Sequence, residues 1–165
     1  MPKNMGQRLA ICSDIISYTP ENHSPNLALA VGWLESRYTD AKGRWLCTNK
    51  GKLVKTKVGH KCLSTGKKSQ LVRAEGPLQI LKKYHCKGEP DCDTTLNGVR
   101  HLYKMVDKYG EKKGLAVYAG GYVNPKSKRY ARYALKVSKK IKSLGLEDFE
   151  LPLPKDISMF WSEIK

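Results

Sequence analysis

Residues 27–38 read LALAVGWLESRY, in which Glu35 closes the apolar run 27–34. Ser24 and Pro25 precede it, and serine as the N-cap with proline at the first helical position is a frequent helix start. The spacing of the apolar residues predicts a helix over about 26–38 with one buried side. Glu35 then lies near the C-terminal end of this helix.

A carboxylate at that position is disfavoured, because the negative end of the helix dipole and burial both oppose the charge. Both effects favour a raised pKa for Glu35 and a protonated acid near neutral pH, which is typical of a general acid. The positive charge of the chain works in the opposite direction. The alternative is an exposed glutamate that pairs with Arg37 or Lys42.

The bulk properties set the class of protein and of partner. The chain has 165 residues, which predicts one domain over 1–165. Its net charge is +16, from 31 basic and 15 acidic residues, so its partner should be anionic: nucleic acid, anionic lipid or a bacterial envelope polymer. No apolar run reaches the roughly 18 residues of a membrane span, and the start lacks the uninterrupted apolar region of a signal peptide.

Most of the chain predicts helices, over 5–18, 93–110, 111–121 and 127–145, and hence a mainly α fold. The segment 42–73 differs, because it carries ten Lys or Arg and no Asp or Glu. Its alternating KLVKTKV and its turn-like neighbours predict a small basic β-hairpin or loop insertion at about 42–75. The insertion is either a solvent-exposed loop with no binding role or a basic surface that holds an anionic substrate electrostatically. A Pro-rich connector leads to a C-terminal segment at about 150–165.

Five cysteines leave at least one unpaired within the chain. Cys86 and Cys92 flank the turn-like KGEPD, and a local disulfide is expected there in an oxidising compartment. Cys47 and Cys62 form a second expected pair. Reduced, buried thiols are the plain alternative, and a four-thiolate zinc site is disfavoured because no C-x-x-C pair is present.

Three short stretches follow Glu35-Ser36 in order: GPLQI (76–80), AVYAGG (116–121) and RYALKV (132–137). Together they resemble the motifs of lytic transglycosylases of the soluble-lytic-transglycosylase type, in the lysozyme-like superfamily. That family has Glu-Ser at a helix end, then Gly-Leu-Met-Gln, then Ala-Tyr-Asn-Ala-Gly, then a late Tyr before a Val. The resemblance covers roughly residues 26–137 and implies an α+β lysozyme-like domain that uses no metal and no cofactor.

The resemblance implies cleavage of the β-1,4 bond between N-acetylmuramic acid and N-acetylglucosamine in peptidoglycan, with Glu35 as the single acid/base. The muramic acid's own 6-hydroxyl closes onto C1 and leaves a 1,6-anhydro sugar, so one carboxylate suffices. Hydrolytic glycosidases use two. No acid lies between Asp40 and Glu75, which are the two candidates for a second acid. A hydrolytic muramidase similar to goose-type lysozymes is the alternative.

The same resemblance suggests Ser36, Gln79, Tyr118 and Tyr133 as substrate-binding residues, and Tyr118 as the side chain that orients the Glu35 carboxyl. Tyr130 lies one turn before Tyr133 and is the alternative to it. Where the family has Asn after the motif tyrosine, this chain has Ala119, which removes one expected hydrogen bond to the sugar. Tyr122 and Asn124 are the nearest candidates to replace that contact.

These features predict a monomeric muralytic enzyme for bacterial lysis or local wall penetration, such as a phage endolysin. It would be made in the host cytoplasm, released by a holin, a virion or a secretion apparatus, and act on the periplasmic cell wall. Its basic surface would hold it to anionic envelope polymers. A binding-only wall protein is a further possibility, and a basic nucleic-acid-binding protein is the distant one.

Overall fold

The computed structural model describes residues 5–87 and 89–145. In this part of the chain lie six helices: α1 (Met5–Tyr18), α2 (Asn26–Ser36), α3 (Lys82–His85), α4 (Thr94–Tyr109), α5 (Glu111–Gly120) and α6 (Pro125–Ser143). Five strands lie between α2 and α3: β1 (Lys42–Cys47), β2 (Lys52–Thr56), β3 (Gly59–Leu63), β4 (Leu71–Glu75) and β5 (Ile80–Leu81). The fold is therefore α+β with helices in the majority, and the C-terminal segment at 150–165 lies outside the described residues.

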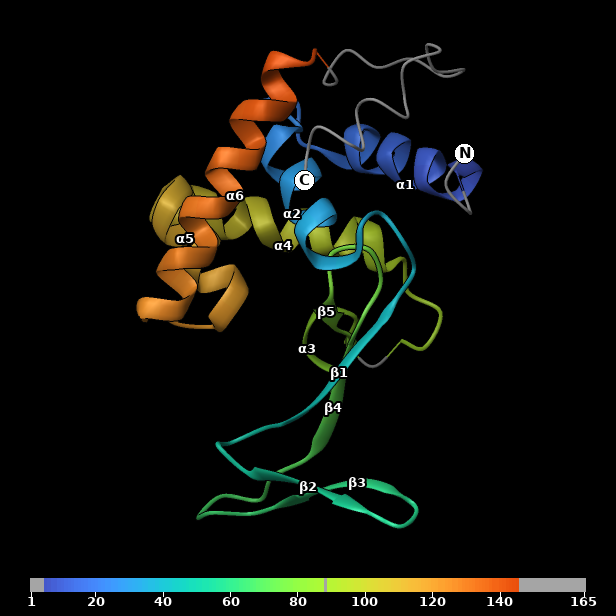
Figure 1. Cartoon of the computed structure of the whole chain (residues 1–165), viewed down its shortest axis with the longest axis vertical. Coiled ribbons are helices and arrows are strands. Elements are labelled where there is room, and N and C mark those ends of the chain that lie inside the picture. Colours follow the sequence, from blue (N-terminus) through green and yellow to red (C-terminus); the bar gives the residue numbers. More distant parts are fainter. Residues whose placement is uncertain (1–4, 88, 146–165) are drawn as a thin grey trace.

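Helix α2 lies in the middle of the helical body, packed against α6 and α1 (Figure 1). The Tyr103 hydroxyl of α4 accepts a hydrogen bond from the Ala28 amide of α2. Eight consecutive residues, Asn26–Trp33, are buried. The prediction of one buried side was therefore too narrow: this helix is apolar nearly all round because its neighbours cover it nearly all round. None of the described helices is both long enough and apolar enough to cross a membrane.

The chain turns sharply after α2. Arg37 and Tyr38 both have left-handed backbone conformations, with φ of 56° and 58°. The fully buried Tyr38 ring folds back under the helix, and its hydroxyl donates a hydrogen bond to the Leu29 carbonyl at 2.8 Å. A Cβ on Gly32 would lie 2.9 Å from Ile15 Cδ1 and 3.2 Å from the Tyr38 ring. The space beside Gly32 is thus filled by the protein and is not left open for a ligand.

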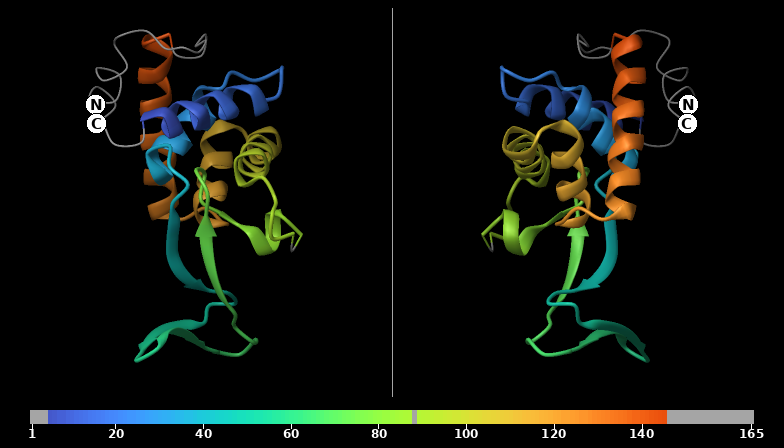
Figure 2. Two further views of the ribbon diagram at one scale, coloured as in Figure 1. Left: turned by 90° about the vertical axis from the view of Figure 1, so that its right-hand side faces the viewer. Right: turned by 90° about the vertical axis from the view of Figure 1, so that its left-hand side faces the viewer.

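The strands form two small antiparallel sheets, in the orders β1-β4-β5 and β2-β3. In the first, Trp45 pairs with Arg73 and Cys47 with Leu71. Residues 48–70, here called the arm, contain β2 and β3 and project away from the helical body (Figures 1 and 2). The basic hairpin that the sequence predicted is therefore present, carried on the ends of β1 and β4.

Two disulfides form, Cys47–Cys62 and Cys86–Cys92, at the pairs that the sequence suggested. Cys12 is a free, buried thiol, and burial raises the pKa of this thiol well above its usual range. Because four of the five cysteines are paired in this way, only the Cys12 thiol remains, too few for the four-thiolate zinc alternative.

Candidate active-site cleft

A cleft of about 420 Å³ lies between the helical body and the inner parts of β1 and β4. Segments far apart in the sequence form its walls: the end of α2, the β1-β4-β5 sheet, α3, α4, α5 and the first turn of α6. The lining side chains are Glu35, Arg44, Leu46, Ala74, Gln79, Ile80, Leu81, His85, His101, Tyr118, Ala119 and Lys126. Glu35 is the only acid among these described residues.

Glu35 reaches the cleft from the last turn of α2. Burial raises the pKa of its carboxyl, and a hydrogen bond from the Tyr130 hydroxyl to Oε1, at 2.7 Å, lowers the pKa by a smaller amount. The net pKa is raised, so the protonated carboxyl persists to higher pH than that of an exposed glutamate. This agrees with the direction expected from the sequence, and here burial is the main cause.

The tyrosine that touches the carboxyl is Tyr130, whereas the resemblance suggested Tyr118 for this role and Tyr133 as the late tyrosine. Tyr133 is 47% exposed and does not line the cleft. The buried side of α6 carries Ala131, Ala134 and Val137, and Tyr130 borders this side while Tyr133 points outward. Tyr130 contacts Glu35 and Tyr133 does not, because Tyr130 lies next to the packed side of α6.

Tyr118 does line the cleft, but its hydroxyl donates a hydrogen bond to the Leu78 carbonyl at 2.5 Å. Burial and then the nearby charge of Glu35 raise the pKa of this phenol well above its usual range. Tyr118 therefore stays neutral and anchors the 76–80 segment to α5, and Tyr130 alone makes the hydrogen bond to Glu35 among the described tyrosines.

The Ser36 hydroxyl also makes its hydrogen bonds within the protein. Its hydroxyl lies 2.8 Å from the Pro77 carbonyl and 3.2 Å from the Gly32 carbonyl, and it accepts the Thr39 amide hydrogen at 3.1 Å. Ser36 is not among the cleft-lining residues. Its observed role is to tie the end of the Glu35 helix to the Gly76-Pro77 turn.

Gln79 lines the cleft as expected, and its backbone has a left-handed φ of 52°. Its Nε2 group donates to the carbonyls of Ala41 and Gly76, at 2.8 and 2.9 Å. A Cβ on Gly43 would fall 2.0 Å from Gln79 Oε1, so a larger residue at this position would displace the amide. Gln79 is thereby held rigidly in the cleft wall.

Neither candidate for a second acid reaches the cleft. Asp40 is exposed in the connection after α2 and is not among the lining residues. Glu75 lies on β4 next to the cleft-lining Ala74, and successive side chains of a strand point to opposite faces. Glu75 accordingly faces the other side of the sheet, where its Oε2 lies 3.4 Å from Lys82 Nζ.

Four polar cleft residues were missed in the sequence: Arg44, His85, His101 and Lys126. The two imidazole rings are 4.0 Å apart between centroids, and the His101 ring is 5.3 Å from that of Tyr118. Burial, followed by the charges of His85 and Lys104, lowers the pKa of His101 to about 4, and burial lowers that of His85. Both rings are therefore neutral at physiological pH. No motif or spacing in the sequence marks these four side chains.

Ala119 lines the cleft where the family has an amide side chain. Asn124 does not replace that amide, because its side chain accepts the Ser127 amide hydrogen at 2.9 Å and caps α6. Tyr122 is 68% exposed and is not a lining residue. The imidazoles of His85 and His101 are neutral hydrogen-bonding groups on the same cleft lining as Ala119.

Replacing Tyr130 with phenylalanine should shift the pH dependence of any activity that needs protonated Glu35. The Tyr130 hydrogen bond favours the ionised carboxylate, so its loss raises the pKa of Glu35 further. Activity lost as pH rises through this pKa should then persist to higher pH in the variant. The measurement is a pH–rate profile of both proteins, and an alkaline limb that stays in place or moves to lower pH contradicts the assignment.

Comparison of the chain with protein-family models, with curated proteins and with solved structures finds no match. The lysozyme-like fold and the family resemblance therefore remain predictions that rest on the motifs and on the geometry of the cleft.

Proposed function

We propose that the protein is a peptidoglycan lytic transglycosylase that cleaves the bond between N-acetylmuramic acid and N-acetylglucosamine. The observation that carries the proposal is that Glu35, with a raised pKa, is the sole acid on the described lining of the cleft. A cleft with one carboxyl, whose pKa is raised, suits a reaction that takes its nucleophile from the substrate. Hydrolysis ordinarily needs a second carboxylate to activate water.

The contacts between the motif segments support this proposal. Ser36 joins the Glu35 helix to Pro77, Tyr118 joins α5 to Leu78, and Tyr130 joins α6 to Glu35. These hydrogen bonds link residues that are between 40 and 95 positions apart in the chain. The segments that hold Glu35-Ser36, 76–80 and 116–121 are thus tied together near one carboxyl, and Tyr130, the alternative to Tyr133, contacts it.

The charge of the cleft supports a muramic acid substrate over a neutral polysaccharide such as chitin. With both histidines neutral, the cationic side chains of the lining are Arg44 and Lys126, and Glu35 is the single acid. The two cations come from β1 and the first turn of α6, on different walls. In peptidoglycan the lactyl group of muramic acid is amide-linked to a stem peptide, whose free carboxylates such cations would attract.

The proposed reaction begins when the Glu35 carboxyl donates its proton to the glycosidic oxygen. The bond from C1 of the muramic residue to this oxygen breaks, and the electron pair stays on the leaving O4 of the glucosamine residue. The 6-hydroxyl oxygen of the same muramic residue forms a new bond to C1. Its proton passes to the Glu35 carboxylate, so the acid is regenerated and no water is consumed.

Mass spectrometry of the fragments released from purified peptidoglycan tests the reaction type. We expect 1,6-anhydromuramic ends, each lighter by one water than a reducing end, because the substrate's own hydroxyl closes the ring. Digestion with a known hydrolytic muramidase gives the reference masses. If the fragments instead carry new reducing muramic ends, the protein is a hydrolase on this cleft and the transglycosylase proposal is wrong.

A further inference from the structure

The arm, residues 48–70, has a defined shape but no core. None of its residues is buried, and Leu53, Val58 and Leu63 are 40%, 98% and 45% exposed. A two-stranded hairpin without a packed face is marginally stable by itself in water. The arm therefore needs other constraints to hold its shape.

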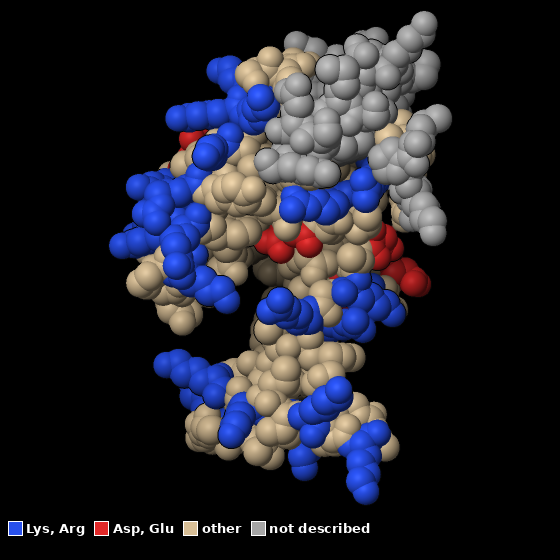
Figure 3. All heavy atoms as spheres, viewed as in Figure 1, with Lys and Arg blue, Asp and Glu red and all other residues tan. Residues whose placement is uncertain are grey.

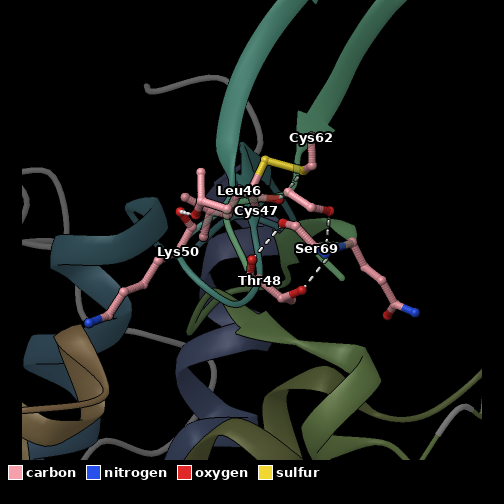
Figure 4. The surroundings of a disulfide bond; sticks show 9 residues. Leu46, Cys47, Thr48, Lys50, Cys62 and Ser69 are labelled. Carbon is pink, nitrogen blue, oxygen red and sulfur yellow. Dashed lines mark hydrogen bonds between the residues drawn. A yellow bond between two sulfur atoms is a disulfide. The ribbon is translucent and has the colours of Figure 1, made fainter. Parts of the chain in front are cut away.

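Covalent and polar links at the base of the arm supply these constraints (Figure 4). The Cys47–Cys62 disulfide joins the end of β1 to β3. Beside it, Ser69 Oγ donates to the Thr48 carbonyl at 2.5 Å, and the Gln70 amide donates to Thr48 Oγ1 at 2.8 Å. Two more side-chain bonds cross the base, from Asn49 to the Lys68 carbonyl and from Thr65 to the Lys50 carbonyl. The arm is thus pre-shaped without a buried residue.

The arm carries one sign of charge. It contains seven lysines and no Asp or Glu: Lys50, Lys52, Lys55, Lys57, Lys61, Lys67 and Lys68, all of them exposed. Among the described residues, none of these lysines forms a salt bridge. Lysines without acidic partners attract a polyanion. Because the arm is already ordered, little conformational entropy is lost when it binds one.

The arm is also continuous with the wall of the cleft. Arg44 and Leu46 on β1 and Ala74 on β4 line the cleft, and the same two strands lead directly into the arm. Only Cys47 separates the cleft-lining Leu46 from the start of the arm. Figure 3 shows Lys and Arg on the arm and on the helical body across a concave side of the molecule.

We propose that the arm extends the substrate groove and binds the anionic glycan strand that enters the Glu35 cleft. This inference rests on the proposed function for the identity of the strand, a peptidoglycan whose stem peptides carry carboxylates. The arm lysines hold carboxylates beyond the cleft, while Arg44 and Lys126 meet them within it. Nucleic acid offers similar charge, but the continuity of the arm with the cleft favours the glycan.

The test measures binding without turnover, using the full chain with Glu35→Gln so that the polymer stays intact. Lys52, Lys55, Lys57 and Lys61 are replaced together with glutamine, and binding to purified peptidoglycan sacculi is followed by co-sedimentation over a salt series. We expect the Kd to rise about ten- to thirtyfold at low salt, because four modest charge contacts are lost. The Kd of the variant should also depend less on salt concentration than that of the parent protein. Binding to a neutral chitin oligosaccharide should stay unchanged.

The matched control removes the same charge from the helical body, with Lys108, Lys112, Lys113 and Lys139 replaced by glutamine, all exposed and outside the arm. We expect at most about a twofold change in the Kd for sacculi. Equal losses in the two variants, or a loss for duplex DNA with sacculus binding intact, overturn the proposal. Wall cleavage is assayed separately, in proteins with and without Glu35. If the arm proposal is wrong, binding to sacculi is unaffected by the arm variant; if the proposed activity is wrong, wall cleavage does not depend on Glu35.

A second variant keeps every lysine and removes only the constraint. Replacing Cys47 and Cys62 with serine should weaken sacculus binding about three- to tenfold, because the arm must then be ordered on binding. The thermal midpoint of the helical body should change little, since the arm contributes no buried residue. Unchanged binding in this variant would show that the pre-shaped arm is not what holds the strand.

Discussion

Replacing Glu35 with glutamine is expected to reduce wall cleavage by about 10²- to 10⁴-fold, the usual contribution of a positioned general acid. Glutamine has nearly the same shape and its carbonyl oxygen still accepts the Tyr130 hydrogen bond, but it has no acidic proton to donate. The measurement is release of soluble fragments from purified peptidoglycan, with turbidity loss of a wall suspension as the second readout.

Glu75→Gln is the matched control, because it makes the same chemical change 40 positions later in the chain. Glu75 faces away from the cleft and pairs with Lys82 at 3.4 Å, in a partly exposed ion pair that contributes little to stability. We expect its cleavage rate to stay within about twofold of wild type. If Glu35→Gln clears the wall as well as wild type does, the assignment of the catalytic acid is wrong.

Gly114→Ala is expected to lower the free energy of unfolding by about 1–3 kcal/mol, because it overpacks the contact between α4 and α5. Gly114 is buried, and a Cβ there would lie 2.7 Å from the Met105 carbonyl oxygen and from Val106 Cα. Both atoms belong to the backbone of α4, so the helices must move apart. Urea unfolding followed by circular dichroism measures the change. Since α5 also carries Tyr118 into the cleft, wall cleavage should fall as well.

Gly6→Ala is the control for the helix propensity of alanine. Gly6 lies in the first turn of α1, and nothing lies within 4 Å of the position of its Cβ. This variant should be unchanged or more stable, by up to about 1 kcal/mol, since alanine favours a helix over glycine. Equal unfolding midpoints for the two variants would contradict the packing argument.

The elements of the fold follow closely from local patterns in the sequence. The apolar spacing in 5–18 predicts α1 (Met5–Tyr18) at its observed bounds, and the strand-like KLVKTKV contains β2 (Lys52–Thr56). The end of α2 differs, because two left-handed residues after Ser36 stop the helix before the predicted 38. That turn is stabilised by the burial of Tyr38, a long-range effect that no local pattern reports.

The cleft shows a similar division. The sequence identified Glu35, Gln79, Tyr118 and Ala119, which all line it. It did not identify His85 or His101, because a histidine in a helical segment has no signature until packing sets which wall it faces. The two rings meet only because α3 lies against α4.

The sequence by itself determined the position of the isolated acid, the acid-free basic insertion and the spacing of the cysteines, because these are properties of neighbours along the chain. The tertiary structure alone decided which tyrosine contacts Glu35, that Ser36 anchors a turn, and that Glu75 faces away from the cleft. Each of these depends on the face that one packed element presents to another. Such faces are set by burial and by hydrogen bonds between residues 40 or more positions apart.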